Sequence, residues 1–246
     1  MTAPSRPSLK QRLASGDDLV GALVRMPAEE LVEMLAVAGH DFVLVDCEHG
    51  SDDIGDLRRH VTAAESFGLP VLARCGSGDT SFLLRALDLG VQGIVAPHVD
   101  SAEAAADLVR AVRYPPHGDR GFAAYSRAGH YGALTRDEHL RRAEDVLLVV
   151  MIESPAAVLA APAITAVRGV DGYLIGTSDL GASRADSDPP LADLVSATHA
   201  TASADAIRFD LAGSADDARS ALGSGARVVV HNLTLEMMGL LRDLRV

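Results

Sequence analysis

The sequence has few of the features that mark secreted, membrane or nucleic-acid-binding proteins. It contains only two cysteines, Cys47 and Cys75, in neither a C-x-x-C pair nor a zinc-type spacing, so we expect reduced, buried thiols. The N-terminal stretch lacks the apolar core of a signal peptide, and no apolar run approaches the roughly 20 residues that span a bilayer. These absences lead us to expect a cytoplasmic protein with no membrane partner.

Positive charge is also scarce. Lys and Arg number 22 against 34 Asp and Glu, which gives a formal net charge of −12. A surface of that sign repels nucleic acid and anionic lipid, and no basic run opposes this effect. The acidity does not define a substrate, because a small anion can still bind at a local positive site.

Eight short apolar runs recur along the chain, and each is nearly continuous rather than alternating. Such runs are typical of parallel strands that are covered on both faces. They lie at residues 19–26, 42–48, 70–76, 93–99, 146–154, 171–179, 206–213 and 226–232. Stretches with helical periodicity lie between most of them, at residues 28–39, 52–68, 79–90, 101–113, 154–167 and 214–225. This alternation predicts an α/β protein with a (β/α)₈ TIM barrel.

A doubly wound open sheet is the competing fold, but its glycine-rich fingerprint is missing from the first strand–helix turn, VRMPAEE. The chain length suits one barrel, so we expect residues 1–246 to form a single domain, with residues 1–18 as a peripheral N-terminal segment. One connection, from residue 99 to 146, is much longer than the others. Long loops in compact domains are usually functional.

The ends of the predicted strands carry a concentration of ionisable side chains: Asp46, Glu48, His49, Arg74, Glu153 and Asp179. Because the carboxyl ends of barrel strands meet at one mouth, we expect these groups to converge there. Clustered carboxylates raise one another's pKa, and a bound divalent metal relieves that repulsion. The sequence therefore favours a metal-assisted site at this mouth.

Each of these residues also has a simpler interpretation. Glu153 and Asp179 offer hard oxygen ligands for Mg²⁺ or Mn²⁺, but either can instead favour a helix N-terminus. Arg74 offers a planar fork to a substrate carboxylate, but it can instead neutralise Asp46. His49 titrates near neutrality, although an isolated histidine is more often structural. Spacing alone leaves both interpretations open.

Several longer motifs resemble the HpcH/HpaI aldolase/citrate lyase family. They are DFVLVDCEHG (41–50), PVLARCGSGDTSFLLRALDLGVQGIVAPHVDSAEAA (70–105), RYPPHGDRGF (113–122), VVMIES (149–154) and GVDGYLIGTSDLGAS (169–183). The resemblance spans about residues 21–183. It implies a metal-dependent barrel enzyme, a carbon–carbon lyase or aldolase acting through a metal-bound enolate of pyruvate or a related 2-oxo acid.

The resemblance also implies roles for particular residues. Glu153 and Asp179 match the metal ligands, with Mg²⁺ expected and Mn²⁺ or Co²⁺ as alternatives. Arg74 matches the arginine that holds the substrate carboxylate and steadies the enolate, and His49 matches the catalytic base. Asp88 matches the acidic partner of that base.

The same comparison implies the remaining contacts. Asp46 matches an acid that lines the pocket, and the peptide around Gly176 and Ser178 matches backbone that contacts the carboxylate. Met151 stands on the same side of its strand as Glu153, where aldolases of the family often have Gln. The family also implies a homo-oligomer, a hexamer or a dimer, built on the C-terminal helix.

Alternative functions remain at this point. A siderophore-type citrate synthase using oxaloacetate and acetyl-CoA, or an oxaloacetate decarboxylase or macrophomate-synthase-like enzyme, would keep the enolate and change the reaction. A non-catalytic binding protein for a 2-oxo acid or citrate is a third class, which the complete metal and base residues oppose. No lysine lies in any predicted strand, which argues against a Schiff-base aldolase.

Overall fold

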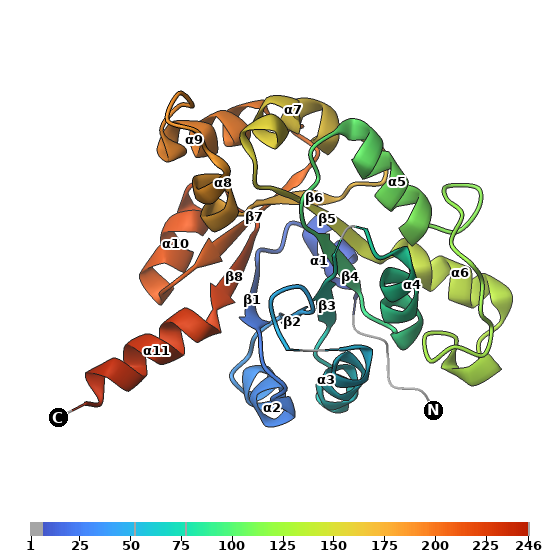
Figure 1. Ribbon diagram of the computed structural model, residues 1–246. Helices are drawn as coiled ribbons and strands as arrows, with labels where there is room; N and C mark the ends of the chain where they lie inside the picture. The colour runs from blue at the N-terminus through green and yellow to red at the C-terminus, as the bar shows by residue number, and fades with distance from the viewer. Residues whose placement is uncertain (1–6, 52, 77, 246) are drawn as a thin grey trace.

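The computed structural model describes residues 7–51, 53–76 and 78–245. Eight parallel strands close into a barrel in which each strand pairs with its neighbours in sequence and β1 pairs with β8 (Figure 1). The strands are β1 (Leu19–Val24), β2 (Phe42–Asp46), β3 (Val71–Arg74), β4 (Gly93–Ala96), β5 (Leu147–Ile152), β6 (Gly172–Ile175), β7 (Ile207–Ala212) and β8 (Val228–Asn232). Each predicted apolar run contains one of them, so the predicted (β/α)₈ barrel is confirmed.

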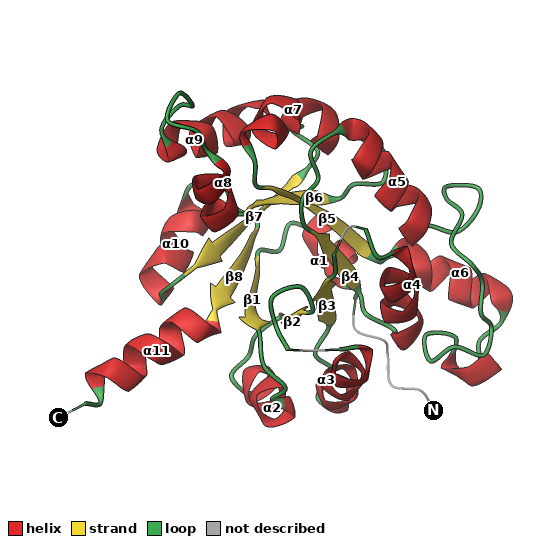
Figure 2. Ribbon diagram, in the orientation of Figure 1, coloured by secondary structure: helices red, strands yellow, loops and turns green. Residues whose placement is uncertain are grey.

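Helices surround the barrel (Figure 2). They are α1 (Leu9–Ala14), α2 (Glu29–Val37), α3 (Ile54–Ser66), α4 (Thr80–Leu89), α5 (Ala102–Val112), α6 (Arg136–Glu144), α7 (Pro155–Thr165), α8 (Thr177–Ser183), α9 (Leu191–Thr201), α10 (Ala215–Gly223) and α11 (Leu233–Asp243), with a short 3₁₀ turn, η1 (His130–Gly132). All six predicted helical stretches contain a helix. The sequence LKQRLA of α1 is too short, and RDEHLRRAE of α6 too polar, to show an apolar period.

The long connection after β4 contains α5, η1 and α6, and its irregular parts are residues 113–129 and 133–135. Local signals set the helix ends as the sequence predicts. The Asp79 side chain accepts a 2.8 Å hydrogen bond from the Phe82 N–H at the start of α4. Gly90 ends that helix with a φ of +99°, a conformation that favours glycine.

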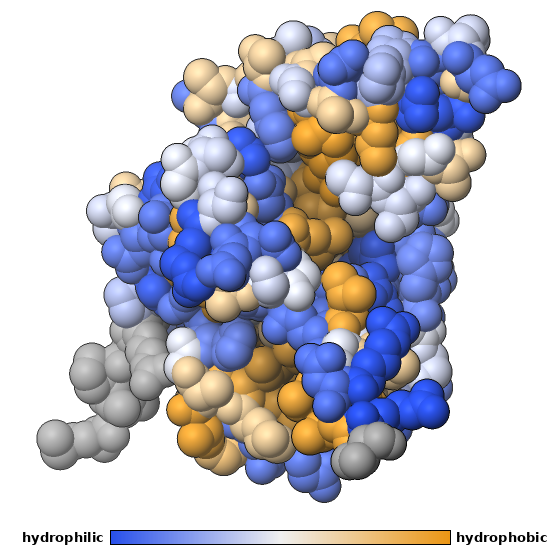
Figure 3. All heavy atoms as spheres, turned by 90° about the vertical axis from the view of Figure 1, so that its left-hand side faces the viewer, coloured by the Kyte–Doolittle hydropathy of each residue, from blue (hydrophilic) through white to orange (hydrophobic). Residues whose placement is uncertain are grey.

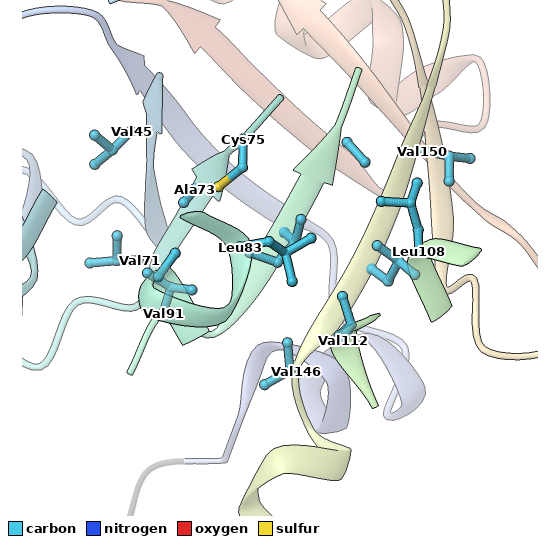
Figure 4. Close-up of a cluster of buried hydrophobic side chains, with 14 of the residues drawn as sticks. Val45, Val71, Ala73, Cys75, Leu83, Val91, Leu108, Val112, Val146 and Val150 are labelled. Carbon is cyan, nitrogen blue, oxygen red and sulfur yellow. The ribbon is translucent and has the colours of Figure 1, made fainter. Parts of the chain in front are cut away.

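Strand residues divide between two cores. Side chains such as Leu44, Leu72 and Val149 fill the barrel interior. Their sequence neighbours, such as Val45, Val71 and Val150, point outward and pack against the helices (Figure 4). Cys75 lies in this outer core, where burial raises the pKa of its thiol well above the ordinary value. The strands are thus covered on both faces, as their continuous apolar pattern predicts.

The expectation that residues 1–18 are peripheral is wrong for α1. Leu9 and Leu13 are 2% and 5% exposed and belong to the cluster that fills the barrel interior. Lys10 forms a 2.7 Å ion pair with Asp171, directly before β6. Helix α1 therefore closes the N-terminal end of the barrel, and residues 1–6 lie outside the described part of the chain. Across the described residues, no helix is both long and apolar enough to cross a bilayer.

Candidate active site

Asp46 and Arg74 form the centre of the strand-end mouth. They stand in register at the ends of β2 and β3. Arg74 donates from Nε to Asp46 Oδ1 at 2.8 Å, and from Nη2 to the other carboxylate oxygen, Oδ2. Asp46 is fully buried and Arg74 nearly so. The guanidinium fork and the carboxylate thus form a bidentate pair, the strongest ionic geometry available to these side chains.

Further donors surround the same carboxylate. Arg25, directly after β1, donates from Nε to Asp46 Oδ2 at 2.9 Å and from Nη1 to Asn232 Oδ1 at 3.0 Å. The backbone N–H groups of Glu48 and His49 donate to Asp46 Oδ1, each at 3.2 Å. Burial alone would raise the pKa of Asp46, but Arg74 and these N–H groups outweigh it and hold the pKa below its usual value. Asp46 is therefore a fixed negative charge that positions two arginines.

His98 links the remaining acids of the mouth. Its Nε2 lies 3.3 Å from Glu48 Oε1 and its Nδ1 lies 3.0 Å from Glu153 Oε1. Its backbone N–H also donates to Glu153 Oε1 at 2.6 Å. His98 adopts a φ of +54°, which is uncommon for a residue other than glycine. This backbone conformation directs both the amide and the ring of His98 to the same carboxylate.

Glu153, directly after β5, is buried among negative charges. Burial raises its pKa; the N–H and the ring of His98 act against that rise, while the charges of Asp179 and Glu48 add to it. Its Oε2 faces Gly176, where an added Cβ would lie only 2.3 Å from this oxygen. Only glycine therefore leaves room for the Glu153 carboxylate at that position.

Glu153 and Asp179 fit a hard divalent cation. Asp179 lies in the first turn of α8 and is half-buried, and its charge is close enough to raise the pKa of Glu153. In the described residues, no group of three or more His, Cys, Asp or Glu side chains is arranged to hold a metal. The chain itself would thus supply two carboxylates, which is the usual protein contribution to Mg²⁺ when waters and a substrate complete the octahedron.

The structure separates His49 from Asp88. His49 lies in the loop after β2, with its Nε2 3.7 Å from Glu48 Oε2, and its side chain is 53% exposed. Asp88 lies in the last turn of α4, which runs back about 15 Å to the N-terminal end of the barrel. There it accepts a 2.9 Å hydrogen bond from Arg120 Nη2. The predicted pairing of Asp88 with His49 therefore does not form within this chain.

Met151 forms an apolar wall of the mouth. Its Sδ lies 3.9 Å from Arg74 Nη1, and its Cε would be 3.2 Å from a Cβ at position 176. This is the orientation that its parity with Glu153 predicts. Ser178 is exposed in the first turn of α8, two residues beyond Gly176. The structure thus brings all of the predicted residues except Asp88 to the C-terminal end of the barrel.

Sequence reasoning overlooked Arg25, His98 and Asn232. All three lie at strand ends, so the rule that singled out Asp46 and Arg74 would also have found them. His98 follows β4 in the run GIVAPHV, and Arg25 follows β1 in LVGALVRM. The contact of Arg25 with Asn232 spans 207 positions and has no local signature.

Comparison with known proteins identifies the family of the chain. The model of the HpcH/HpaI aldolase/citrate lyase family matches residues 23–237. The chain belongs to this family. A hydroxypyruvate/pyruvate aldolase of Delftia acidovorans is 34% identical over 97% of this chain and 90% of its own length. A 2-keto-3-deoxy-L-rhamnonate aldolase of Salmonella gallinarum is 35% identical over 71% of this chain and 65% of its own length.

A solved structure of another protein in the family has the same architecture as this chain. The HpcH/HpaI aldolase/citrate lyase family protein of Burkholderia cenocepacia is 28% identical, and the alignment covers 96% of each chain with a TM-score of 0.86. The resemblance noted from the motifs is thereby confirmed, and it extends well beyond residue 183.

Proposed function

We propose that this protein is a divalent-metal-dependent carbon–carbon lyase that forms or cleaves an aldol bond to pyruvate or a related 2-oxo acid. The observation that carries the proposal is the position of the buried Arg74 beside Glu153. The pKa of Glu153 is raised by burial and by neighbouring carboxylates. The guanidinium can bind the carboxylate of a 2-oxo acid, and the neighbouring pair of carboxylates, Glu153 and Asp179, can bind a divalent cation. The aldolase names of the relatives support this reading.

The residues of the mouth divide the work. Arg74 uses Nε and Nη2 for Asp46, so Nη1 is the nitrogen that points toward Met151 and the open mouth. We assign to Nη1 the binding of the substrate carboxylate and of the oxygen on which charge develops. Glu153 and Asp179 would hold the cation, Mg²⁺ in the first instance, with Mn²⁺ or Co²⁺ as alternatives. When bound, this cation supplies a Lewis acid that polarises the keto group.

Proton transfer falls to His49. Its imidazole is exposed in the loop after β2, and the hydrogen bond from its backbone N–H to Asp46 holds its backbone in place. A histidine here can take the proton of the aldol hydroxyl during cleavage and return it during synthesis. The Gly176 N–H already donates to the Ile152 carbonyl at 3.1 Å, so the backbone N–H that we assign to the substrate carboxylate is that of Ser178, in the first turn of α8.

A coupled assay tests the proposal. Pyruvate released from 4-hydroxy-2-oxo acids is measured with lactate dehydrogenase and NADH, in the presence of Mg²⁺ and after exhaustive chelation. Metal-dependent pyruvate release is the expected result. Thiol release from acetyl-CoA with oxaloacetate would instead identify a citrate synthase, loss of CO₂ from oxaloacetate a decarboxylase, and binding without turnover a non-catalytic protein.

We further propose that the active form is a homo-oligomer, a dimer or hexamer, joined through α11. None of the residues of α11 is buried, and Leu235, Leu240, Leu241 and Leu244 are each more than half exposed. Helix α11 projects away from the barrel at the left of Figure 1. Figure 3 shows this side of the molecule face-on, and hydrophobic residues lie on its lower part. Light scattering should show an assembly that Leu240→Glu with Leu244→Glu disrupts.

A further inference from the structure

A cavity lies at the end of the barrel opposite the mouth. Its volume is about 380 Å³, and it is bounded by α1, the end of α4, the long connection and α6. Gln92 and Val146, which directly precede β4 and β5, place it at the N-terminal ends of those strands. Its cationic and imidazole lining is Arg120, Arg127, Arg141, Arg142, His130 and His139. The cavity therefore shares no residue with the mouth.

The charge of this cavity opposes that of the protein. Four arginines and only two acids, Glu65 and Asp145, line it, although the chain as a whole carries −12. Both acids are already engaged: Arg127 Nη1 donates to Glu65 Oε1 at 2.7 Å, and Gln11 Nε2 donates to Asp145 Oδ2 at 2.9 Å. Arg141 forms no hydrogen bond or ion pair with any residue that the structure describes. Arg141 is exposed and, among the described residues, acts only through its charge on Glu138, so the rim of the cavity keeps a guanidinium whose N–H donors are free to bind a ligand.

Arg120 adds an observation of a different kind. Its side chain is only 2% exposed, its guanidinium stacks on the Tyr114 ring at 4.5 Å, and its Nη2 donates to Asp88. Its Nε is buried and has no hydrogen-bond partner among the described residues. A buried donor without an acceptor is costly, and such groups in native proteins are usually satisfied by something that binds. Here the unsatisfied donor belongs to a side chain that lines the cavity.

We propose that this cavity binds a small anion through a phosphate or carboxylate head group. Guanidinium groups present paired N–H donors that match the oxygens of both kinds of anion. Arg120 would supply the buried donor, and Arg141 would supply a guanidinium at the rim that forms no salt bridge with the described residues. Ser8, Gln11 and Gln92 line the same space and offer hydrogen bonds to hydroxyl groups of the ligand. A volume of this size accommodates a small metabolite rather than a bare ion.

Calorimetric titration of the full chain tests the site directly. The probes are inorganic phosphate, 3-phosphoglycerate and citrate at constant ionic strength, so that the phosphate and carboxylate arms are separated. We expect saturable binding of at least one probe, weakened about 10-fold or more by Arg141→Ala, with Arg120→Lys as a second variant that keeps the charge but lacks Nε. Arg136→Ala on the same helix is the matched control, because Arg136 does not line the cavity.

Binding at the mouth is distinguished by Arg74→Ala, which should leave the affinity of the probe unchanged. The proposal is independent of the proposed reaction, because its readout is binding and the turnover of Arg141→Ala should equal that of the wild type. Absence of saturable binding by all three probes up to about 10 mM would overturn it. So would equal affinity in Arg141→Ala and the wild type, or loss of binding in Arg74→Ala.

Discussion

Arg25 Nε donates a 2.9 Å hydrogen bond to Asp46 Oδ2, the same carboxylate oxygen that Arg74 Nη2 binds. With Asn232 on the other side of Arg25, this contact forms a continuous polar array across β8, β1, β2 and β3. Asp46 is thereby shared by two guanidinium groups, and it fixes both. The array leaves Nη1 of Arg74 directed at the mouth, which is why we regard Arg25 as a positioning residue.

Replacing Arg25 should therefore impair turnover, although the Arg25 side chain does not contact the reacting atoms. In Arg25→Met, Asp46 keeps its bidentate pair with Arg74 but loses one charged hydrogen bond, on the order of 1.5–3 kcal/mol. We expect kcat/KM for pyruvate release to fall about 10-fold or more while the metal affinity is kept. Arg136→Met, on the exposed face of α6, is the control. Wild-type kinetics in Arg25→Met would show that Arg74 is held well enough without it.

Removal of the Glu153 carboxylate should abolish metal dependence. Glu153→Gln retains an oxygen that can accept from the His98 N–H, so the fold should persist, but the amide offers a cation no charge. We expect the affinity for Mn²⁺, measured by electron paramagnetic resonance, to fall at least about 10-fold. We also expect turnover to be lost. Full activity of the wild type after exhaustive chelation would contradict the metal role of both Glu153 and Asp179.

Substitution of lysine for Arg74 should be damaging although the charge is kept. A lysine cannot bind both oxygens of Asp46 and also present a nitrogen to the substrate. We expect a loss of at least about 2 kcal/mol in transition-state stabilisation, the scale for a missing donor at a preorganised site. The measurement is kcat/KM together with the melting temperature. Near-normal kinetics in a folded Arg74→Lys variant would reduce Arg74 to an ion-pair partner of Asp46.

Met151 should influence which partner the enolate accepts. Its thioether lies beside Arg74 and offers no donor, so a hydroxyl placed against it loses about 1–3 kcal/mol for want of a partner. Met151→Gln should shift relative kcat/KM toward hydroxyaldehydes and leave metal affinity unchanged. A panel of aldehydes and 2-oxo acids that ranks identically for both proteins would identify Met151 as packing alone.

Stability should decline in mildly acidic solution because of buried and half-buried histidines. Burial lowers the pKa of His199, whose Nδ1 lies 3.1 Å from the Tyr173 hydroxyl, and likewise the pKa of His40 and His139. The unfolded chain, with histidine pKa values near 6.5, binds more protons just below that pH. The contribution of these histidines to the free energy of unfolding is thus fully present above pH 6.5, and it decreases as the pH falls toward their folded-state pKa. Urea unfolding of wild type and His199→Asn at pH 7.5 and 5.5 should show a smaller decrease for the variant.

An equal decrease in both proteins would assign the pH dependence to other groups. The His199 ring contacts Tyr173 and none of the residues assigned to the mouth, so its effect on stability can be measured without reference to activity.

The sequence predicts those site residues whose positions depend only on where a strand ends and on which face of the strand a side chain lies. Asp46, Arg74, Met151 and Glu153 stand at or beside the ends of apolar runs, and parallel strands in a barrel present those ends together. Arg25 and His98 satisfy the same rule, because each lies in the last residues of a predicted apolar run, 19–26 and 93–99, but neither stands in an acidic cluster such as that of Asp46 and Glu48. Their partners lie on other strands, and only the closed barrel brings them together.

The errors have a similar origin. Asp88 occurs in a motif that matches the family, but the motif alone does not predict at which end of the barrel the Asp88 side chain lies. Helix direction places Asp88 beside Arg120, away from His49. For α1, six residues show too little periodicity to reveal that Leu9 and Leu13 cover the barrel interior. That role depends on the shape of a cavity made by strands far along the chain.

The pairing of β1 with β8 also has a consequence for synthesis of the chain. Asp18 and Arg227, which flank these strands and form a 2.6 Å hydrogen-bonded ion pair, are 209 positions apart. A nascent chain leaving the ribosome therefore carries β1 with one open edge, and Leu9 and Leu13 without their full cover, until β8 emerges. Open strand edges are templates for intermolecular pairing. The barrel therefore cannot close before β8 has been synthesised, and a chain truncated before residue 228 forms a sheet that stays open.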